Sequence, residues 1–243
     1  MLKFLWVVFM NLDEFKNEIE KLNIKYTELM LEQLEDYCNT LLEYNAHTNL
    51  TAIREKNEVY LKHFYDSLTL VKVVDLEKIN TVIDIGTGAG FPGLVLKIFF
   101  PHLKITLLDS NGKKTKFLSF IVDKLKLINI DIVNDRVEKY SKSHLNYFDL
   151  VTSRAVTNMP VLSELSLPLV KKDGLFVAMK GKCLDELEKA DKTIKLMGGK
   201  IIDLNIFDLY NNSGERTLIK IKKIKTTDIL EIRSYEKIIK KPR

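Results

Sequence analysis

The sequence has 243 residues, of which 46% are hydrophobic and 29% charged, and its formal net charge is +5. A globular chain of this size buries enough apolar surface to fold without a disulfide or a structural metal. Only two cysteines occur, Cys38 and Cys183, and no histidine stands at ligand spacing from either. This pattern argues against a zinc or iron–sulfur site, so we expect no metal and a reducing, cytoplasmic compartment.

Residues 1–10 are nearly all apolar. This stretch is too short to span a bilayer, and it runs into Asp13 and Glu14 without a small-residue cleavage site. We therefore expect neither a membrane anchor nor a signal peptide. One hypothesis is that the natural start is Met10.

Residues 12–75 have the apolar periodicity of helices, interrupted between Asn45 and Thr51. Apolar residues recur there at spacings of three and four, which puts them on one helical face: Met30, Leu34, Tyr37, Leu41 and Tyr44. Such a stripe is typical of a packing face. We expect an N-terminal helical region over residues 11–77.

From Thr81 onward, short β-branched runs alternate with longer amphipathic segments. The expected strands are 81–85, 105–109, 130–133, 148–153 and 175–180, and the expected helices are 91–100, 113–127, 161–170 and 184–197. Two alternating runs, 200–207 and 217–224, predict a closing antiparallel hairpin. The pattern predicts a doubly wound α/β domain over residues 78–226, with an antiparallel final strand and a basic tail over 227–243.

A glycine-rich turn, Asp84-Ile85-Gly86-Thr87-Gly88-Ala89-Gly90, joins the first expected strand to its helix. Glycines at this junction let backbone approach a ligand closely and direct helix N–H groups towards it. Dinucleotide dehydrogenases carry similar turns, so the glycines alone do not identify the ligand. Asp84 suits a cationic amino-acid group or ordered water, whereas it would repel a pyrophosphate.

Acidic residues also follow the second and third expected strands. Asp109 ends the second strand, 19 residues after Gly90, where a carboxylate can accept the hydroxyls of a ribose. The segment 135–138 follows the third strand, where the edge of an adenine would lie. Each acid alone is equally compatible with a helix cap or a solvated loop. In register they predict a nucleoside site, and Asp84 favours S-adenosylmethionine over a dinucleotide.

Longer segments carry a more specific pattern: 82–94, 107–114, 117–118, 49–51, 63–68, 153–155, 180–181, 214–216 and 241–242. They resemble one known family, the bacterial RsmG (GidB) methyltransferases, which act on guanine N7 in small-subunit ribosomal RNA. The Phe-Pro-Gly that follows the third glycine is more specific than the glycines themselves. The resemblance extends over nearly all of residues 12–243, but residues 1–10 have no counterpart and the tail around Tyr235 departs from the family's basic-proline pattern.

The resemblance implies a Rossmann-like class I methyltransferase fold, S-adenosylmethionine as cofactor and a set of site residues. It implies Gly86 and Phe91 at the methionine and ribose end, Asp109 at the ribose, Val137 and Glu138 at the adenine, Arg154 beside the methyl group, and Lys180 facing the RNA or the target base. Asp84, Gly88 and Gly90 of the turn complete the candidate cofactor site. Guanine N7 has no proton to lose, so Arg154 and Lys180 are expected to position the substrate, with no general base.

The distribution of charged residues indicates what kind of partner the protein binds. From Arg216 to Arg243 there are ten lysines and arginines against three acids. Such a tail suits a polyanion, although Lys220, Lys222 and Lys223 equally suit the solvent side of a final strand. We expect 16S ribosomal RNA, a small ribosomal subunit or an assembly intermediate as the partner. We expect no DNA or membrane binding, and a monomer.

Other interpretations stay open from the residues alone. They are a methyltransferase for a small molecule or protein, a non-catalytic RNA-binding or ribosome-assembly protein with the same fold, and, less favoured, a nicotinamide dehydrogenase. His63 and Asp66 have no serine or cysteine nucleophile in a recognisable turn beside them. A hydrogen bond on a helix surface or between domains is therefore favoured over a catalytic His–Asp pair.

Overall fold

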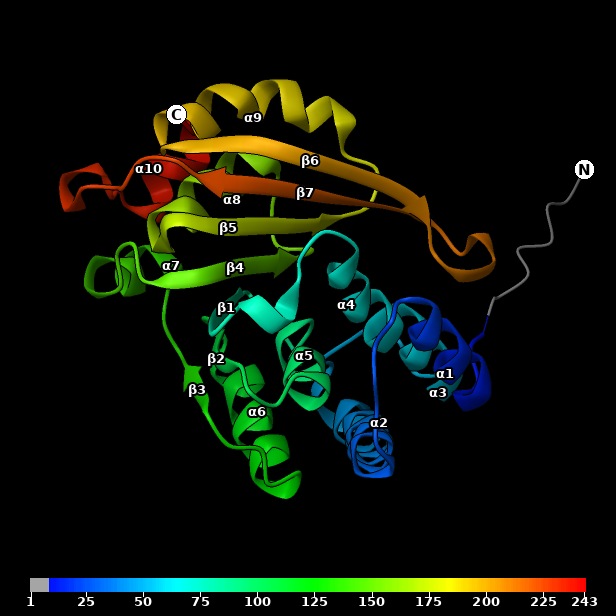
Figure 1. The fold of residues 1–243 in the computed structure, drawn as a ribbon. Coiled ribbons are helices and arrows are strands. Elements are labelled where there is room, and N and C mark those ends of the chain that lie inside the picture. Colours follow the sequence, from blue (N-terminus) through cyan, green and yellow to red (C-terminus); the bar gives the residue numbers. More distant parts are fainter. Residues whose placement is uncertain (1–8) are drawn as a thin grey trace, which may run out of the picture.

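A computed structural model describes residues 9–243, and its centre is a seven-stranded sheet of order β3-β2-β1-β4-β5-β7-β6 (Figure 1). The strands are β1 (Thr81–Ile85), β2 (Lys104–Leu108), β3 (Ile130–Val133), β4 (Phe148–Arg154), β5 (Val170–Lys180), β6 (Gly199–Asp208) and β7 (Glu215–Lys223). β1 to β5 pair in parallel, and β7 pairs antiparallel with both β5 and β6. The predicted doubly wound sheet with an antiparallel final strand is confirmed.

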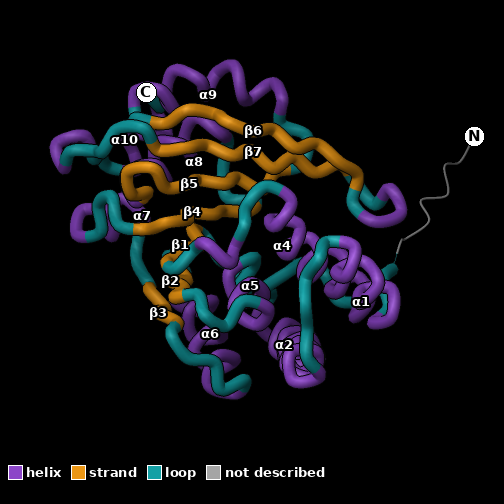
Figure 2. The backbone as a smooth tube through the Cα atoms, viewed as in Figure 1, coloured by secondary structure: helices purple, strands orange, loops and turns teal. Residues whose placement is uncertain are grey.

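Helices cover both faces of this sheet (Figure 2). Those of the α/β part are α5 (Gly93–Phe99), α6 (Gly112–Lys124), α7 (Val137–Tyr140), α8 (Met159–Ser166), α9 (Leu184–Leu196) and α10 (Tyr235–Lys240), with 3-10 turns at Ser141–Ser143, Leu167–Leu169, Tyr210–Asn212 and Ile229–Glu231. Successive strand residues point to opposite faces. Val82 accordingly joins a core with α5 and α6, whereas Ile83 joins a core with α8 and α9.

The predicted N-terminal helical region is present. Its elements are α1 (Leu12–Lys21), α2 (Glu28–Thr48), α3 (Lys56–Val59), a π-helix at Tyr60–Tyr65, α4 (Asp66–Leu68) and 3-10 turns at Thr69–Lys72 and Leu76–Lys78. Asn11 and Glu14 form a capping box at the start of α1, and Thr27 caps α2. In the predicted stripe of α2, Leu34, Tyr37 and Leu41 are fully buried, and Met30 and Tyr44 pack against them.

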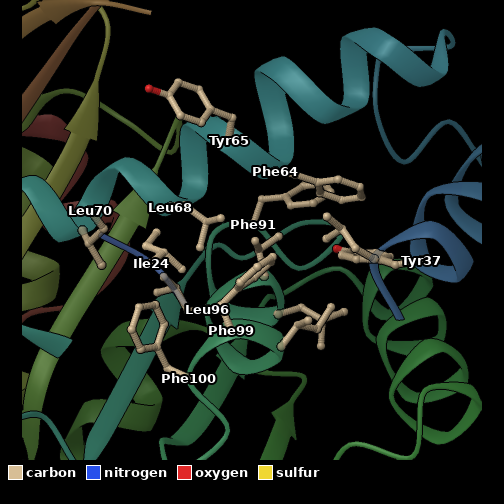
Figure 3. Close-up of a cluster of buried hydrophobic side chains, with 14 of the residues drawn as sticks. Ile24, Tyr37, Phe64, Tyr65, Leu68, Leu70, Phe91, Leu96, Phe99 and Phe100 are labelled. Atoms are coloured by element: carbon tan, nitrogen blue, oxygen red, sulfur yellow. The ribbon is translucent and has the colours of Figure 1, made fainter. Parts of the chain in front are cut away.

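The helical region packs against the glycine turn and α5 (Figure 3). One hydrophobic core contains residues from both sides of residue 77, the predicted domain boundary. The ring of Tyr37 stacks on Phe91 with centroids 5.4 Å apart, and its hydroxyl donates to the Ala89 carbonyl. The ring centroids of Phe15 and Phe99 lie 6.1 Å apart. The division into separate domains stays a prediction.

Residues 1–8 lie outside the described part of the chain, and with them most of the apolar stretch 1–10. Met10 is buried, and its N–H donates to the Asn57 carbonyl. The hypothesis of a start at Met10 stays a prediction. Among residues 9–243, no helix has the length and apolar character that crossing a membrane requires.

The helix predicted over 161–170 ends earlier than expected. α8 stops at Ser166, Leu167–Leu169 form a 3-10 turn, and Val170 already pairs with Phe148 in the sheet. Pro168 has no N–H to continue the helical ladder, which explains the early end. The strand predicted over 175–180 begins earlier, at Val170, and within it Asp173 has a φ of +65° and the register with β4 shifts.

The residues after β7 fold back onto the molecule. Lys223, expected on the solvent side of the last strand, is fully buried and donates to the Met197 carbonyl (2.6 Å) and the Thr227 hydroxyl (2.5 Å). That part of the expectation is wrong, because the end of α9 and the segment that follows β7 cover this side chain. Lys222 pairs with Asp173 at 3.0 Å.

Candidate functional site

The glycine turn follows β1 in a conformation that side chains oppose. Gly86, Gly88 and Gly90 have φ values of +66°, +64° and +106°. A Cβ at Gly86 would lie 2.5 Å from a methyl of Val156, and one at Gly90 would lie 2.7 Å from the Tyr37 hydroxyl. A Cβ at Gly88 would meet nothing closer than 4.0 Å. Packing therefore requires two of the glycines, and the third leaves room for a ligand to approach the backbone.

Asp84 holds this turn from beneath. Its Oδ2 accepts from the Thr87 hydroxyl (2.7 Å) and the Gly93 N–H (2.8 Å), while its buried Oδ1 has no partner among the described residues. Burial raises the pKa of Asp84 to about 7. The side chain is fully buried, so the structure gives it a positioning role in the turn. Its predicted direct contact with the cofactor stays a prediction.

Asp109 links the ends of β1 and β2. Its two oxygens accept from the N–H groups of Gly88 (3.0 Å) and Asn111 (2.9 Å), and Lys114 lies 3.6 Å away. These bonds fix the carboxylate beside the glycine turn. A carboxylate oxygen can accept more than one hydrogen bond, so both retain capacity for ribose hydroxyls.

A cavity of about 260 Å³ opens beside these residues at the carboxyl ends of β1, β2 and β3. Its walls include four of the predicted cofactor residues: Gly86, Asp109, Val137 and Glu138. Glu138 is nearly buried, and its Oε2 has no hydrogen-bond partner within residues 9–243. An unpaired buried acceptor is costly unless a ligand donates to it. The cavity therefore fits a nucleoside with an exocyclic amino group.

A second cavity of about 570 Å³ adjoins the first, because Ala155 and Val156 line both. Arg154 lies in its wall at the end of β4. The guanidinium donates to Asp66 Oδ2 (2.9 Å) and the Lys62 carbonyl (2.9 Å), and lies 3.2 Å from Nδ1 of His63. Three partners fix Arg154 in the wall of the larger cavity, next in sequence to Ala155, which lines both cavities.

Lys180 lies in the same larger cavity. Its ammonium pairs with Glu186 (2.8 Å) and donates to the Thr157 carbonyl (2.8 Å). Glu186 also accepts from the Met159 N–H at 2.8 Å. Lys180 therefore reaches the cavity as half of an ion pair, and its predicted place facing the RNA or the target base stays a prediction.

Phe91 lies behind the cavity wall. His63 stacks on its ring with centroids 4.3 Å apart, and the Arg154 guanidinium lies 5.2 Å from it. Among the described residues that line the two cavities, Phe91, Asp84, Gly88 and Gly90 are absent. Phe91 thus supports His63 and Arg154, and its predicted cofactor contact stays a prediction.

Asp66 and Arg216 also line the larger cavity, and neither was predicted as a site residue. Arg216 Nε donates to Asp66 Oδ1 at 2.8 Å, so this carboxylate joins two arginines. For His63 and Asp66, the sequence favoured a hydrogen bond on a helix surface or between domains over a catalytic pair, and this network agrees with that interpretation. The resembling segment 214–216 was the only sequence signal that pointed to Arg216.

A sequence model of the family described as "GidB: rRNA small subunit methyltransferase G" matches residues 30–216. A protein of Bacillus licheniformis named ribosomal RNA small subunit methyltransferase G is 50% identical over 217 residues, covering 88% of this chain and 91% of that protein. Its namesake in Bacillus subtilis is 44% identical over 221 residues, covering 90% and 92%. The chain belongs to this family.

Solved structures with the same fold are more distant from this methyltransferase G family member. A precorrin-6y methyltransferase of Geobacter metallireducens has 18% identity and a TM-score of 0.51 over 66% of this chain and 88% of that one. The YcgJ protein of Bacillus subtilis has 13% identity and a TM-score of 0.52, over 67% and 100%. These likenesses confirm the Rossmann-like fold.

Family membership makes the chain a methyltransferase with S-adenosylmethionine as its cofactor. The smaller cavity fits that cofactor, because its walls offer Gly86 of the turn, the Asp109 carboxylate and an unpaired acceptor at Glu138. The assignment of individual residues to parts of the cofactor stays a prediction.

Proposed function

We propose that this methyltransferase transfers the methyl group of S-adenosylmethionine to N7 of a guanine in small-subunit ribosomal RNA. The names of its relatives and their coverage of the chain support the RNA substrate. The observation that carries the choice of atom is the larger cavity, in which the acids Asp66 and Glu186 are both held in ion pairs.

A general base needs a lone pair and a pKa that suit proton removal. In the cavity wall, Asp66 is held by two arginines and Glu186 by Lys180. Burial and the Arg154 guanidinium lower the pKa of His63 to about 3, so its imidazole is a weak base. This set of side chains suits a target atom that carries a lone pair and no proton, which is the case for guanine N7.

In this proposal the cofactor supplies a sulfonium methyl group, which the N7 lone pair takes as the carbon–sulfur bond breaks. Arg154 lines the larger cavity beside Ala155, which lines both cavities, and in this proposal it orients the base towards the methyl group. Arg216 holds Asp66, and Asp66 in turn holds Arg154. Lys180 and Glu186, paired with each other, line the same cavity.

The rim of the larger cavity suits a phosphate backbone. Lys182 is exposed there and takes part in no ion pair within the described range. Lysines of this kind give sequence-independent contacts with phosphates that weaken as salt rises. The site of action in this proposal is the cytoplasm, where small ribosomal subunits are assembled, and the enzyme acts as a monomer.

The test is transfer of a labelled methyl group to small-subunit RNA, and to small subunits, from a strain that lacks this enzyme. N7-methylguanosine at a single position is the expected product. Arg154→Ala should lower turnover on RNA far more than the affinity for S-adenosylhomocysteine, and Lys182→Ala should mainly weaken RNA binding. Methyl transfer to another atom would refute the choice of N7. No transfer to any RNA form, with intact S-adenosylhomocysteine binding, would refute the RNA substrate.

A further inference from the structure

The C-terminal segment 227–243 reaches the cofactor cavity. Tyr235, the first residue of α10, lines that cavity together with Val137 and Glu138. The guanidinium of Arg136, from the loop before α7, lies 4.4 Å from the centroid of the Tyr235 ring. Tyr235, 99 positions after Arg136 in the sequence, thus places an aromatic ring at the expected adenine end.

Three anchors hold the segment in place on either side of Tyr235. Upstream, the Thr227 N–H donates to Asn146 Oδ1 at 2.9 Å. Arg233 donates from Nε and Nη2 to the two oxygens of Glu164, both at 2.6 Å. Downstream, the backbone N–H of Arg243 donates to the same carboxylate at 3.0 Å.

Glu164 is the buried carboxylate to which the segment binds. Its side chain, on α8, is 2% exposed, so its charge needs these partners to offset the cost of burial. Bidentate contact with an arginine is the geometry that best satisfies a carboxylate. Ile238 of α10 adds an apolar contact, because it is buried in the core formed with α8. The segment is therefore packed and ion-paired in the free enzyme, and Tyr235 has a defined position.

The chemistry of this wall is that of a purine site. Tyr235 presents an aromatic ring, Val137 an apolar side chain, and Glu138 an unpaired buried oxygen. Base–aromatic contacts contribute about 1–3 kcal/mol each. An amino group on the purine would satisfy Glu138 Oε2, which no described residue does.

We propose that segment 227–243 completes the cofactor site: Tyr235, fixed by Arg136, forms the wall against which the adenine of S-adenosylmethionine packs, and Glu164 holds that wall in place. This inference rests on the smaller cavity being the cofactor site of the proposed function. It makes Tyr235 a cofactor-binding residue and Glu164 and Arg233 positioning residues.

The test is calorimetric titration of the full chain with S-adenosylhomocysteine. Tyr235→Ala should weaken binding about tenfold, within the range of a lost base–aromatic contact. Tyr235→Phe keeps the ring and should stay within about twofold of the wild type. Leu230→Ala is the matched control, since Leu230 belongs to the same segment and is 89% exposed. Its affinity should equal that of the wild type.

Arg233→Met tests the anchor. It should weaken S-adenosylhomocysteine binding, and adding Tyr235→Ala should weaken it little further, because both changes remove the same wall. Wild-type affinity in Tyr235→Ala would overturn the proposal, as would equal losses in Tyr235→Ala and Leu230→Ala. Since this titration contains no RNA, a wild-type enzyme that binds S-adenosylhomocysteine but methylates no RNA would refute the RNA proposal alone.

Discussion

The guanidinium of Arg154 lies 2.9 Å from Asp66 Oδ2, and it joins the end of β4 to the helical region 88 positions earlier in the chain. Arg216 of β7 occupies the other oxygen of the same carboxylate. One buried acid of the helical region thus sets the positions of two cations that lie 62 positions apart, on β4 and β7.

Asp66→Asn should separate these arginines. We expect turnover on RNA to fall roughly 100-fold, as misplacement of a positioning group does, with S-adenosylhomocysteine affinity within about threefold of the wild type. The free energy of unfolding should fall by about 3 kcal/mol, because the arginines lose a buried partner. Asp36→Asn, the same change at an exposed position of α2, is the control. Unchanged turnover in Asp66→Asn would show that Arg154 needs no such restraint.

The glycines of the turn should respond differently to alanine. Gly86→Ala should disrupt the fold locally, because its Cβ would overlap Val156. Gly88→Ala costs about 1–2 kcal/mol for its positive φ, but its Cβ would enter open space. We therefore expect Gly88→Ala to fold and to lose most of its S-adenosylhomocysteine affinity. Gly112→Ala, at the start of α6 with an ordinary φ, is the control and should leave the affinity and the melting temperature unchanged. Full S-adenosylhomocysteine affinity in Gly88→Ala would show that the ligand does not lie against the turn.

Asp84 should tolerate loss of charge better than loss of its oxygen. Asp84→Asn keeps an acceptor for Thr87 and Gly93 and should change the free energy of unfolding by about 1 kcal/mol or less. Asp84→Ala leaves both donors unpaired and should cost about 2–3 kcal/mol together with cofactor affinity. Denaturant unfolding with S-adenosylhomocysteine titration measures both. Equal effects of the two variants would contradict a role for Asp84 as an acceptor.

His63 should make the protein less stable in mild acid. Its folded pKa is about 3, whereas an unfolded histidine has a pKa of about 6.5. Between these values the unfolded chain binds more protons, so the free energy of unfolding falls as pH drops below 6.5, by up to about 1.4 kcal/mol per pH unit. Above pH 7 the effect vanishes. His63→Gln should remove this part of the slope in denaturant unfolding between pH 6.5 and 4.5, and equal slopes in both proteins would contradict it.

The strands of the sheet could be predicted from the sequence, because a short contiguous run of residues indicates each strand. The β-branched run 81–85 and the turn from Gly86 to Gly90 identify β1 and its crossover without reference to the rest of the chain. The contact between Asp66 and Arg216 has no such signal, since 150 positions separate the residues. Similarly, the tail appears in the sequence as a run of free charges. Arg233 and Arg243 are instead paired with Glu164, which lies in a different helix.

The hydrogen bond from Tyr37 to the Ala89 carbonyl predicts that substitutions far from the cavities will impair cofactor binding. Tyr37 lies in α2 and lines neither cavity, yet it supports the backbone that the cofactor must approach. Substitutions along the buried face of α2 should therefore appear in a mutational scan as losses of cofactor affinity. A map of functional positions would then include the whole helical region, although most of its buried residues never contact a substrate.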